Sequence, residues 1–242
     1  MEVMQYAEDA LTINLGNEVD EKINRQLVIL KAAIEKLEIE GITDIVLSYT
    51  SLIVYFDVQK TNIEKLKESL STLDLSDLTD STYSYKVIKI PVCYGGKFGP
   101  DLDSFKADGL EPEDVIARHS EKEYLVYMLG FMPGFPFLGG LDESLYKARL
   151  DSPRTKIPAG SVGIGGQQTG MYPFDSPGGW NLLGRTPIPL YDSSRESAIL
   201  YEAGDRIIYT SIDEDEYYRI QEAYEKGQYT VDIEYRGEEN GA

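Results

Sequence analysis

The chain has 242 residues, with 23 Lys and Arg against 42 Asp and Glu and a formal net charge of −19. Such a charge repels the phosphates of nucleic acid and anionic membrane surfaces, so neither is an expected partner. The single cysteine excludes an intrachain disulfide and fits the cytoplasm, which is the expected location. The first residues lack a basic stretch followed by an apolar run, so no signal peptide is predicted.

The first third of the chain alternates β-rich segments with segments of helical periodicity. Alternating apolar residues predict a strand over 11–15, and apolar residues at helical spacing predict an amphipathic helix over 18–39. Two short β-rich runs then predict a hairpin over 45–57. Thr61 and Glu64 form a capping-box pattern at the start of a second helix. These segments predict a βαββα unit.

A change of composition divides the chain into two predicted domains. The Ser-, Thr- and Asp-rich stretch 71–84 predicts a linker, so an α+β domain with its linker is placed at 1–84. From residue 85 short strand-like segments alternate with turn residues, which predicts an antiparallel β-barrel or sandwich over 85–242. Its predicted strands are 85–92, 123–132, 161–168, 180–184, 187–191, 205–211 and 229–235, and its predicted helices are 111–118 and 213–226.

Residues 130–190 differ from the rest of the chain in composition and charge. They hold 12 of the 22 glycines, 8 of the 11 prolines and the only tryptophan, Trp180. Between Ser144 and Leu190 there are two acidic and five basic residues, which gives a local charge of +3. Glycine allows other groups to approach the backbone closely, and proline fixes the backbone angle φ. This stretch therefore predicts rigid loops and short strands around a pocket for a small anion or amide.

His119 is the only histidine, so any histidine-dependent step must use it. Histidine titrates near neutrality and suits a general acid, a general base or an anion ligand. The alternative is a residue at the C-terminal end of a helix, where the helix dipole favours it. One histidine and one cysteine make a zinc site unexpected, and no metal is predicted.

Three further features have both a functional and a structural interpretation. Arg154 and Arg185 lie beside prolines and either bind a carboxylate or phosphate or form surface salt bridges. Trp180 follows two glycines and either faces a cleft or packs in the core. The segment GFMPGFPFLGG at 130–140 is either buried core or an exposed apolar docking patch.

Three long motifs, in this order, resemble one family. They are IPVCYGGKFGPDLD, DVIARHSEKEYLVYMLGFMPGFPFLGGLD and SPRTKIPAGSVGIGGQQTGMYPFDSPGGWNLLGRTP. The family groups the B-type subunit of 5-oxoprolinase, the inhibitor of sporulation histidine kinase A and the allophanate hydrolase subunit 1 domain. With weaker matches on both sides, the resemblance spans nearly the whole chain. It implies an N-terminal α+β domain followed by a C-terminal cyclophilin-like antiparallel β-barrel.

The resemblance also implies a cleft lined by the family's histidine and by its PRxxIPAG, QTG and SPGGW motifs. Catalytic roles are expected for His119, Arg154 and Arg185. The implied substrate-binding residues are Pro158, Gln168, Thr169, Ser176, Gly178, Gly179 and Trp180. If the apolar patch is exposed, the residues expected to dock a partner are Phe131, Pro133, Phe135 and Phe137.

The function implied by the resemblance is that of a subunit in an ATP-dependent 5-oxoprolinase complex, which hydrolyses 5-oxo-L-proline to L-glutamate. Its partners would be the A- and C-type subunits. ATP would be used by the complex, and this chain, which has no Walker pattern, is expected to bind none and to be inactive alone. The alternatives are an inhibitor that docks on a sporulation sensor histidine kinase, or a component of an allophanate hydrolase.

Overall fold

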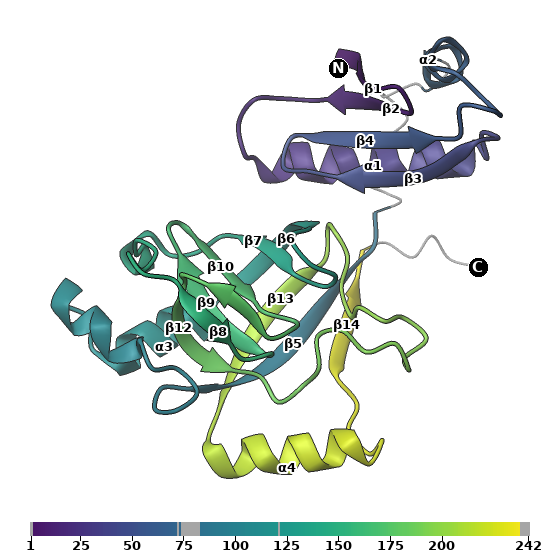
Figure 1. Cartoon of the computed structure of the whole chain (residues 1–242). Coiled ribbons are helices and arrows are strands. Elements are labelled where there is room, and N and C mark those ends of the chain that lie inside the picture. Colours follow the sequence, from purple (N-terminus) through teal and green to yellow (C-terminus); the bar gives the residue numbers. More distant parts are fainter. Residues whose placement is uncertain (1, 72, 74–82, 121, 238–242) are drawn as a thin grey trace. The chain divides into compact units, whose positions relative to one another are not determined.

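The structure is a computed structural model that describes residues 2–71, 73, 83–120 and 122–237. The chain divides into two compact units. One consists of Met1–Tyr85 with Arg236–Ala242, and the other of Lys86–Tyr235. The first unit is a sheet with the helices α1 and α2, and Figure 1 shows that the second unit is built around a barrel. Within the described ranges, no helix is long and apolar enough to cross a membrane.

The first unit is a four-stranded antiparallel sheet with one helix packed on it. Its elements are β1 (Glu2–Ala7), β2 (Ala10–Asn14), α1 (Glu21–Lys36), β3 (Ile42–Leu47), β4 (Ser51–Phe56) and α2 (Ile63–Ser71). The strand order is β1-β2-β4-β3, and α1 lies along the sheet (Figure 1). The apolar stripe of α1 and the inward residues of β2 and β4 form the core, with Leu11, Ile13, Leu27, Leu30, Ile34, Leu52 and Val54 almost fully buried.

Two details of this unit differ from the sequence prediction. The start of α2 is capped by Asn62, whose Oδ1 accepts the N–H of Lys65 at 3.0 Å, and not by a box of Thr61 and Glu64. Strand β1 was not predicted, because most of its side chains are exposed and apolar residues do not alternate along it. The predicted linker at 71–84 falls largely outside the described residues.

The second unit is a closed barrel. Its strands are β5 (Tyr85–Tyr94), β6 (Glu123–Leu129), β7 (Pro136–Gly139), β9 (Ser161–Gly165), β10 (Gln168–Met171), β12 (Asn181–Arg185) and β13 (Arg206–Ile212). They pair in the order β12-β9-β10-β7-β6-β13-β5, and a further pairing of β12 with β5 closes the seven-stranded ring. Strand β14 (Asp232–Arg236) adds to β5, while β8 (Arg154–Ile157) and β11 (Ser176–Gly178) form a separate two-stranded ribbon. The predicted α+β unit followed by a cyclophilin-like barrel is confirmed.

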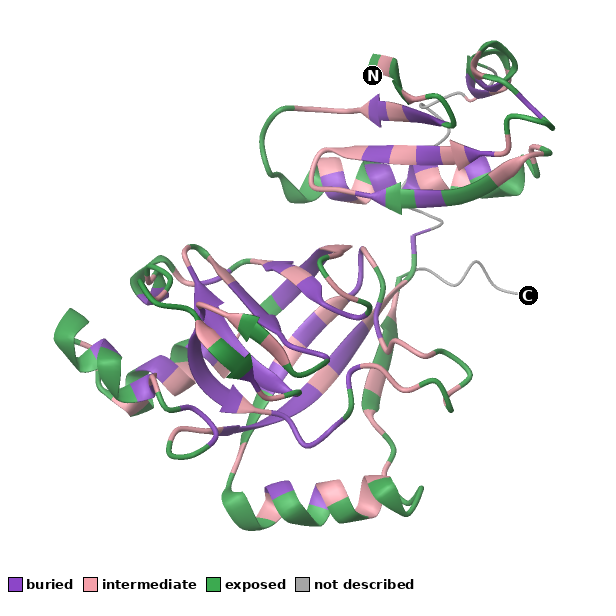
Figure 2. Cartoon of the chain, viewed as in Figure 1, coloured by how far each residue is buried: buried purple, intermediate pink, exposed green. Residues whose placement is uncertain are grey.

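The barrel interior is filled by the side chains of one buried hydrophobic cluster. Figure 2 colours much of the barrel strands as buried. Helix α3 (Pro112–Ser120) packs against β13 and the 3-10 helix η3 (Leu102–Asp108). Helix α4 (Glu214–Glu225) buries Tyr217 and Ile220 and leaves most of its surface exposed (Figure 2). A second 3-10 helix, η4, covers Glu143–Leu145.

Three sequence predictions about the barrel need correction. The segment 161–168 is not one strand, because the chain turns at Gly166, with φ of +67°, from β9 into β10. The segment 187–191 forms only an isolated bridge at Tyr191, since Pro187 and Pro189 have no N–H to donate to a ladder. Among the described barrel strands all pairings are antiparallel except β5 with β13, which is parallel.

Candidate functional site

The ring of Trp180 lies against the bare backbone of two barrel strands. A Cβ atom on Gly165 of β9 would lie 2.3 Å from the indole Nε1, and one on Gly170 of β10 would lie 3.1 Å from the indole Cζ3. Phe135 and Tyr172 contact the indole edge-on, with ring centroids at 5.7 and 6.1 Å. Trp180 is consequently 5% exposed. The glycines of the GIGG and QTG motifs therefore provide the space in which the indole packs.

A pocket of about 180 Å³ lies beside this ring. It is lined by Phe131, Phe135, Phe137, Arg149, Tyr172, Pro177, Gly178, Gly179 and Trp180. The sequence prediction treated the phenylalanine segment and the SPGGW motif as two separate features. The sheet order β12-β9-β10-β7 brings them together, because SPGGW leads into β12 and the phenylalanine segment leads into β7. We refer to this cavity as the aromatic pocket.

The segment 130–140 contains both buried and exposed side chains. Phe135 is 3% exposed and belongs to the core cluster around Trp180, while Phe131 is 69% exposed. Phe131 also has a φ of +66°, a conformation that costs a bulky residue about 1–3 kcal/mol. Pro133 is exposed and Phe137 is half-buried. Docking of a partner by these four residues stays a prediction, and Phe135 could take part only from beneath the surface.

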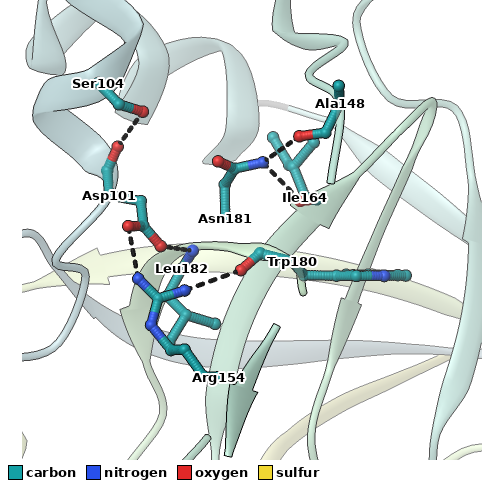
Figure 3. Close-up of polar contacts among 8 residues, drawn as sticks. All are labelled: Asp101, Ser104, Ala148, Arg154, Ile164, Trp180, Asn181 and Leu182. Carbon is teal, nitrogen blue, oxygen red and sulfur yellow. Dashed lines mark hydrogen bonds and ion pairs between the residues drawn. The ribbon is translucent and has the colours of Figure 1, made fainter. Parts of the chain in front are cut away.

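Arg154 is held beside the Trp180 backbone by Asp101 (Figure 3). Its Nη2 donates to Asp101 Oδ1 at 2.6 Å, and its Nη1 donates to the carbonyl of Trp180 at 3.3 Å. The other carboxylate oxygen of Asp101 accepts the N–H of Leu182 at 2.6 Å. Figure 3 shows the indole of Trp180 pointing away from the guanidinium. Arg154 therefore joins β8, β12 and the loop before η3, and its charge is balanced by Asp101.

Arg185 lies at the other end of β12, roughly 15 Å along the strand from Trp180. Its guanidinium carbon is 5.9 Å from the centroid of the Phe98 ring. Its Nε is buried and has no hydrogen-bond partner among the described residues. Arg185 is thus placed outside the aromatic pocket.

His119 lies inside the barrel and is fully buried. Its Nε2 is 2.7 Å from Thr169 Oγ1, and its Nδ1 is 2.8 Å from the hydroxyl of Tyr94. The Thr169 hydroxyl donates its only proton to the carbonyl of Gly163 at 3.1 Å, so its oxygen accepts a hydrogen bond from the Nε2–H of His119. Nδ1 then accepts from Tyr94, and we assign the neutral tautomer with the proton on Nε2. The ring also stacks on Tyr209 with centroids at 4.6 Å.

Burial lowers the pKa of His119 from 6.5 to about 3. The unfolded chain therefore takes up a proton near pH 6.5 while the folded chain does not, and stability is full above pH 6.5 and lost as the pH falls toward 3. We expect this group to contribute a slope of about 1.4 kcal/mol per pH unit in that window. The free energy of unfolding in urea, measured for the native chain and for His119→Gln between pH 4 and 7, gives this slope. The pH range lies around and below the unfolded pKa of 6.5.

The His119→Gln variant is expected to lose this slope while keeping the pH dependence contributed by the carboxylates. The single histidine also gives one set of ring NMR signals, expected to stay those of the neutral ring down to about pH 4. A ring that titrates near neutrality in the folded chain is incompatible with the buried, neutral His119.

The remaining predicted substrate-binding residues do not line the pocket. Ser176 of β11 pairs with Ile157 of β8, and its Oγ is buried with no hydrogen-bond partner among the described residues. Pro158 and Gln168 are half-buried. Of the predicted cleft, the structure therefore brings Gly178, Gly179 and Trp180 to the pocket. His119 and Thr169 lie inside the barrel, and Arg154 lies beside Asp101.

Sequence reasoning missed Arg149 and Tyr172, which line the pocket, and Asp101, which holds Arg154. Arg149 contributed to the local positive charge, but it lies outside the conspicuous motifs. Tyr172 lies between the QTG and SPGGW motifs and carried no separate signal. In the part of the chain that the structure describes, no cluster of His, Cys, Asp and Glu is arranged to hold a metal ion.

The fold and this pocket define a cyclophilin-like β-barrel that follows an α+β unit and carries a small aromatic pocket. The family described as "Carboxyltransferase domain, subdomain C and D" matches residues 1–201. The B-type subunit of the 5-oxoprolinase of Bacillus subtilis (strain 168) is 38% identical over 232 residues, covering 91% of this chain and 97% of that protein. The chain therefore belongs to this carboxyltransferase-domain family, with a B-type 5-oxoprolinase subunit among its relatives, as the motifs predicted.

Solved structures agree on the fold. A crystal structure of the protein TTHA0988 matches with a TM-score of 0.75 and 35% identity, covering 84% of this chain and 40% of that chain. The urea carboxylase of Kluyveromyces lactis matches with a TM-score of 0.76 and 23% identity, over 97% of this chain and 24% of that chain. The second match supports the fold alone. This chain thus spans less than half of each of these longer proteins.

Proposed function

We propose that this chain is one subunit of an ATP-dependent 5-oxoprolinase complex that hydrolyses 5-oxo-L-proline to L-glutamate. The observation that carries the proposal is the 38% identity with the B-type 5-oxoprolinase subunit of Bacillus subtilis over 97% of that protein. A match over the whole length of one subunit supports the same place in the same kind of assembly, which a shared fold alone does not. The aromatic pocket adds support because its volume, about 180 Å³, suits a small molecule.

The complex, and not this chain, is proposed to bind and hydrolyse ATP. A lactam resists hydrolysis, so ATP would activate it by phosphorylating the amide oxygen. Water would then attack the ring carbon, the ring C–N bond would break, and phosphate would leave. The share proposed for this chain is to hold the substrate and to stabilise charge, while the A- and C-type subunits supply the remaining groups.

His119, Arg154 and Arg185 remain proposed functional residues, with roles limited by where they lie. Arg154 borders the Trp180 end of β12. It would bind a ligand while keeping its ion pair with Asp101. Arg185 would act at the far end of that strand. His119 is buried and neutral, so its proposed role becomes the positioning of Thr169 on β10 in place of proton exchange with a ligand.

Reconstitution tests the proposed function directly. Mixing this chain with A- and C-type subunits should give L-glutamate from 5-oxo-L-proline, dependent on ATP and on the presence of every subunit. This chain alone should give none. Glutamate is measured by chromatography and ADP by a coupled assay. Glutamate formation that proceeds at the same rate when this chain is left out contradicts the proposal.

The exposed Phe131, 69% accessible on the rim of the pocket, favours protein docking as a second candidate role. The same preparation is therefore added to a sporulation sensor histidine kinase, and autophosphorylation is followed. An enzyme subunit is expected to leave that rate unchanged, whereas an inhibitor reduces it. Release of ammonia from allophanate, assayed in parallel, separates the third alternative.

A further inference from the structure

The aromatic pocket is lined by an exposed cation, Arg149, that has no acidic partner among the residues the structure describes. Arg149 lines the pocket, and its guanidinium carbon lies 5.9 Å from the centroid of the Trp180 ring. It forms no ion pair or hydrogen bond with any described residue. Three of the other four bases in this positively charged segment form ion pairs: Lys147 with Asp108, Arg154 with Asp101, and Lys156 with Asp175. The fourth, Arg185, lies at the far end of β12, outside the pocket. The guanidinium of Arg149 is therefore available to form an ion pair with an anionic group that enters the pocket.

A second polar group, the Tyr172 hydroxyl, belongs to the same pocket. Tyr172 is 2% exposed, and its hydroxyl has no hydrogen-bond partner among the described residues. Burial raises the pKa of Tyr172 to about 12, against the smaller opposing effect of Arg149 and Arg154. The hydroxyl is therefore protonated at neutral pH, and it can donate to a carbonyl or accept from an N–H.

The remaining walls are aromatic and closely spaced. Phe131, Phe135 and Phe137 form a chain of edge-to-face contacts with centroids at 5.5 and 5.3 Å, and Trp180 packs on Phe135. Such rings pack well against a flat ring. The volume of about 180 Å³ is below the roughly 300–1,000 Å³ of sites that enclose drug-sized ligands. The space suits one small ring.

We propose that the aromatic pocket binds a small cyclic amide that carries a carboxylate, with Arg149 holding the carboxylate and Tyr172 bonding the amide. The choice of 5-oxo-L-proline as this ligand rests on the proposed function. An arginine is suited to the carboxylate because its planar guanidinium can donate two parallel hydrogen bonds. The aromatic walls contact the ring faces, and Gly178 and Gly179 leave the entrance free of side chains.

The only tryptophan of the chain lines the pocket, so its fluorescence reports binding without a label. We expect a saturable change in Trp180 emission on addition of 5-oxo-L-proline. The lactam 2-pyrrolidinone, which lacks the carboxylate, should bind about tenfold more weakly. Arg149→Gln should weaken binding of 5-oxo-L-proline about tenfold and leave 2-pyrrolidinone unaffected. Lys156→Gln, an exposed base paired with Asp175, is the matched control and should bind like the native chain.

The reconstituted complex gives a second readout. Arg149→Gln should raise KM for 5-oxo-L-proline about tenfold with a smaller change in kcat, and Lys156→Gln should change neither. Equal titration curves together with an equal KM for Arg149→Gln and the native chain overturn the pocket assignment. So does loss of subunit assembly with unchanged ligand binding, which would make the pocket a contact for a partner.

The two proposals can fail separately. If 5-oxo-L-proline binds in a manner that depends on Arg149 but the complex makes no glutamate, the proposed function is contradicted and the proposed binding site is supported. An active complex whose KM is unmoved by Arg149→Gln removes the pocket and supports the function.

Discussion

Replacing Gly165 by alanine is expected to destabilise the barrel by about 2–3 kcal/mol and to displace Trp180. The added Cβ would lie 2.3, 2.5 and 2.6 Å from three atoms of the indole, closer than packed carbon atoms approach. The ring has little room to yield, since Gly170, Phe135 and Tyr172 contact its other parts. The aromatic pocket would change shape with it, and binding of a small ligand there should be lost.

Unfolding in urea, followed by tryptophan emission, measures this effect in the barrel alone because the only tryptophan lies there. Gly179→Ala is the matched control. It also adds one methyl group beside Trp180, but its Cβ would meet only Leu150 and Pro153 at 3.5–3.8 Å. The control should keep the native stability and emission maximum. A Gly165→Ala protein as stable as the control, with unchanged emission, would show that the indole does not need the bare backbone.

Replacing Asp101 by asparagine is expected to cost about 2–3 kcal/mol, the second large effect. The carboxylate, 14% exposed, accepts from Arg154 and from the N–H of Leu182, both at 2.6 Å. An amide can accept only one of these bonds and turns its NH₂ group toward the other donor. Arg154 would then keep a half-buried charge without a counter-charge. The backbone hydrogen bond from the N–H of Asp101 to the carbonyl of Leu182 at 3.1 Å would still join β12 to the loop before η3.

Asp103→Asn serves as the control for this substitution. Asp103 lies two positions further along, in η3, and pairs with Lys106 at 2.7 Å, but its side chain is 79% exposed. Water screens such a pair, and the variant should be indistinguishable from the native chain in urea unfolding. Equal midpoints for the two variants would mean that the Asp101–Arg154 pair adds nothing to stability.

The sequence predicted the class of fold well and the composition of the site only in part. Alternating apolar residues and turn signals indicate the barrel strands, and the motifs indicate the cyclophilin-like arrangement. The division of 161–168 into β9 and β10 was missed because both strands share one glycine-rich run. That Phe131 and Trp180 line one pocket was missed because it depends on the sheet order β12-β9-β10-β7, which no local pattern reveals.

The side chains with a functional interpretation were also predicted unevenly. Trp180 was expected either to face a cleft or to pack in the core, and it does both. His119 was singled out by being unique, but its burial between Tyr94 and Thr169 depends on the closed barrel. Arg149 has no sequence signal of its own. It differs from Lys147, Arg154 and Lys156 of its segment in forming no ion pair, and from Arg185 in lining the pocket.

The parallel pairing of β5 with β13 determines the order in which the barrel can be assembled during synthesis. Arg206 pairs with Val87, across more than a hundred residues of intervening chain. A nascent chain that has not yet released β13 from the ribosome can form the local β9–β10 hairpin but cannot close the ring. Such distant pairing slows folding, since the ends of a long loop must meet before any contact stabilises them. The barrel therefore completes late, and until then β5 and β6 present unpaired edges on which chaperones can act.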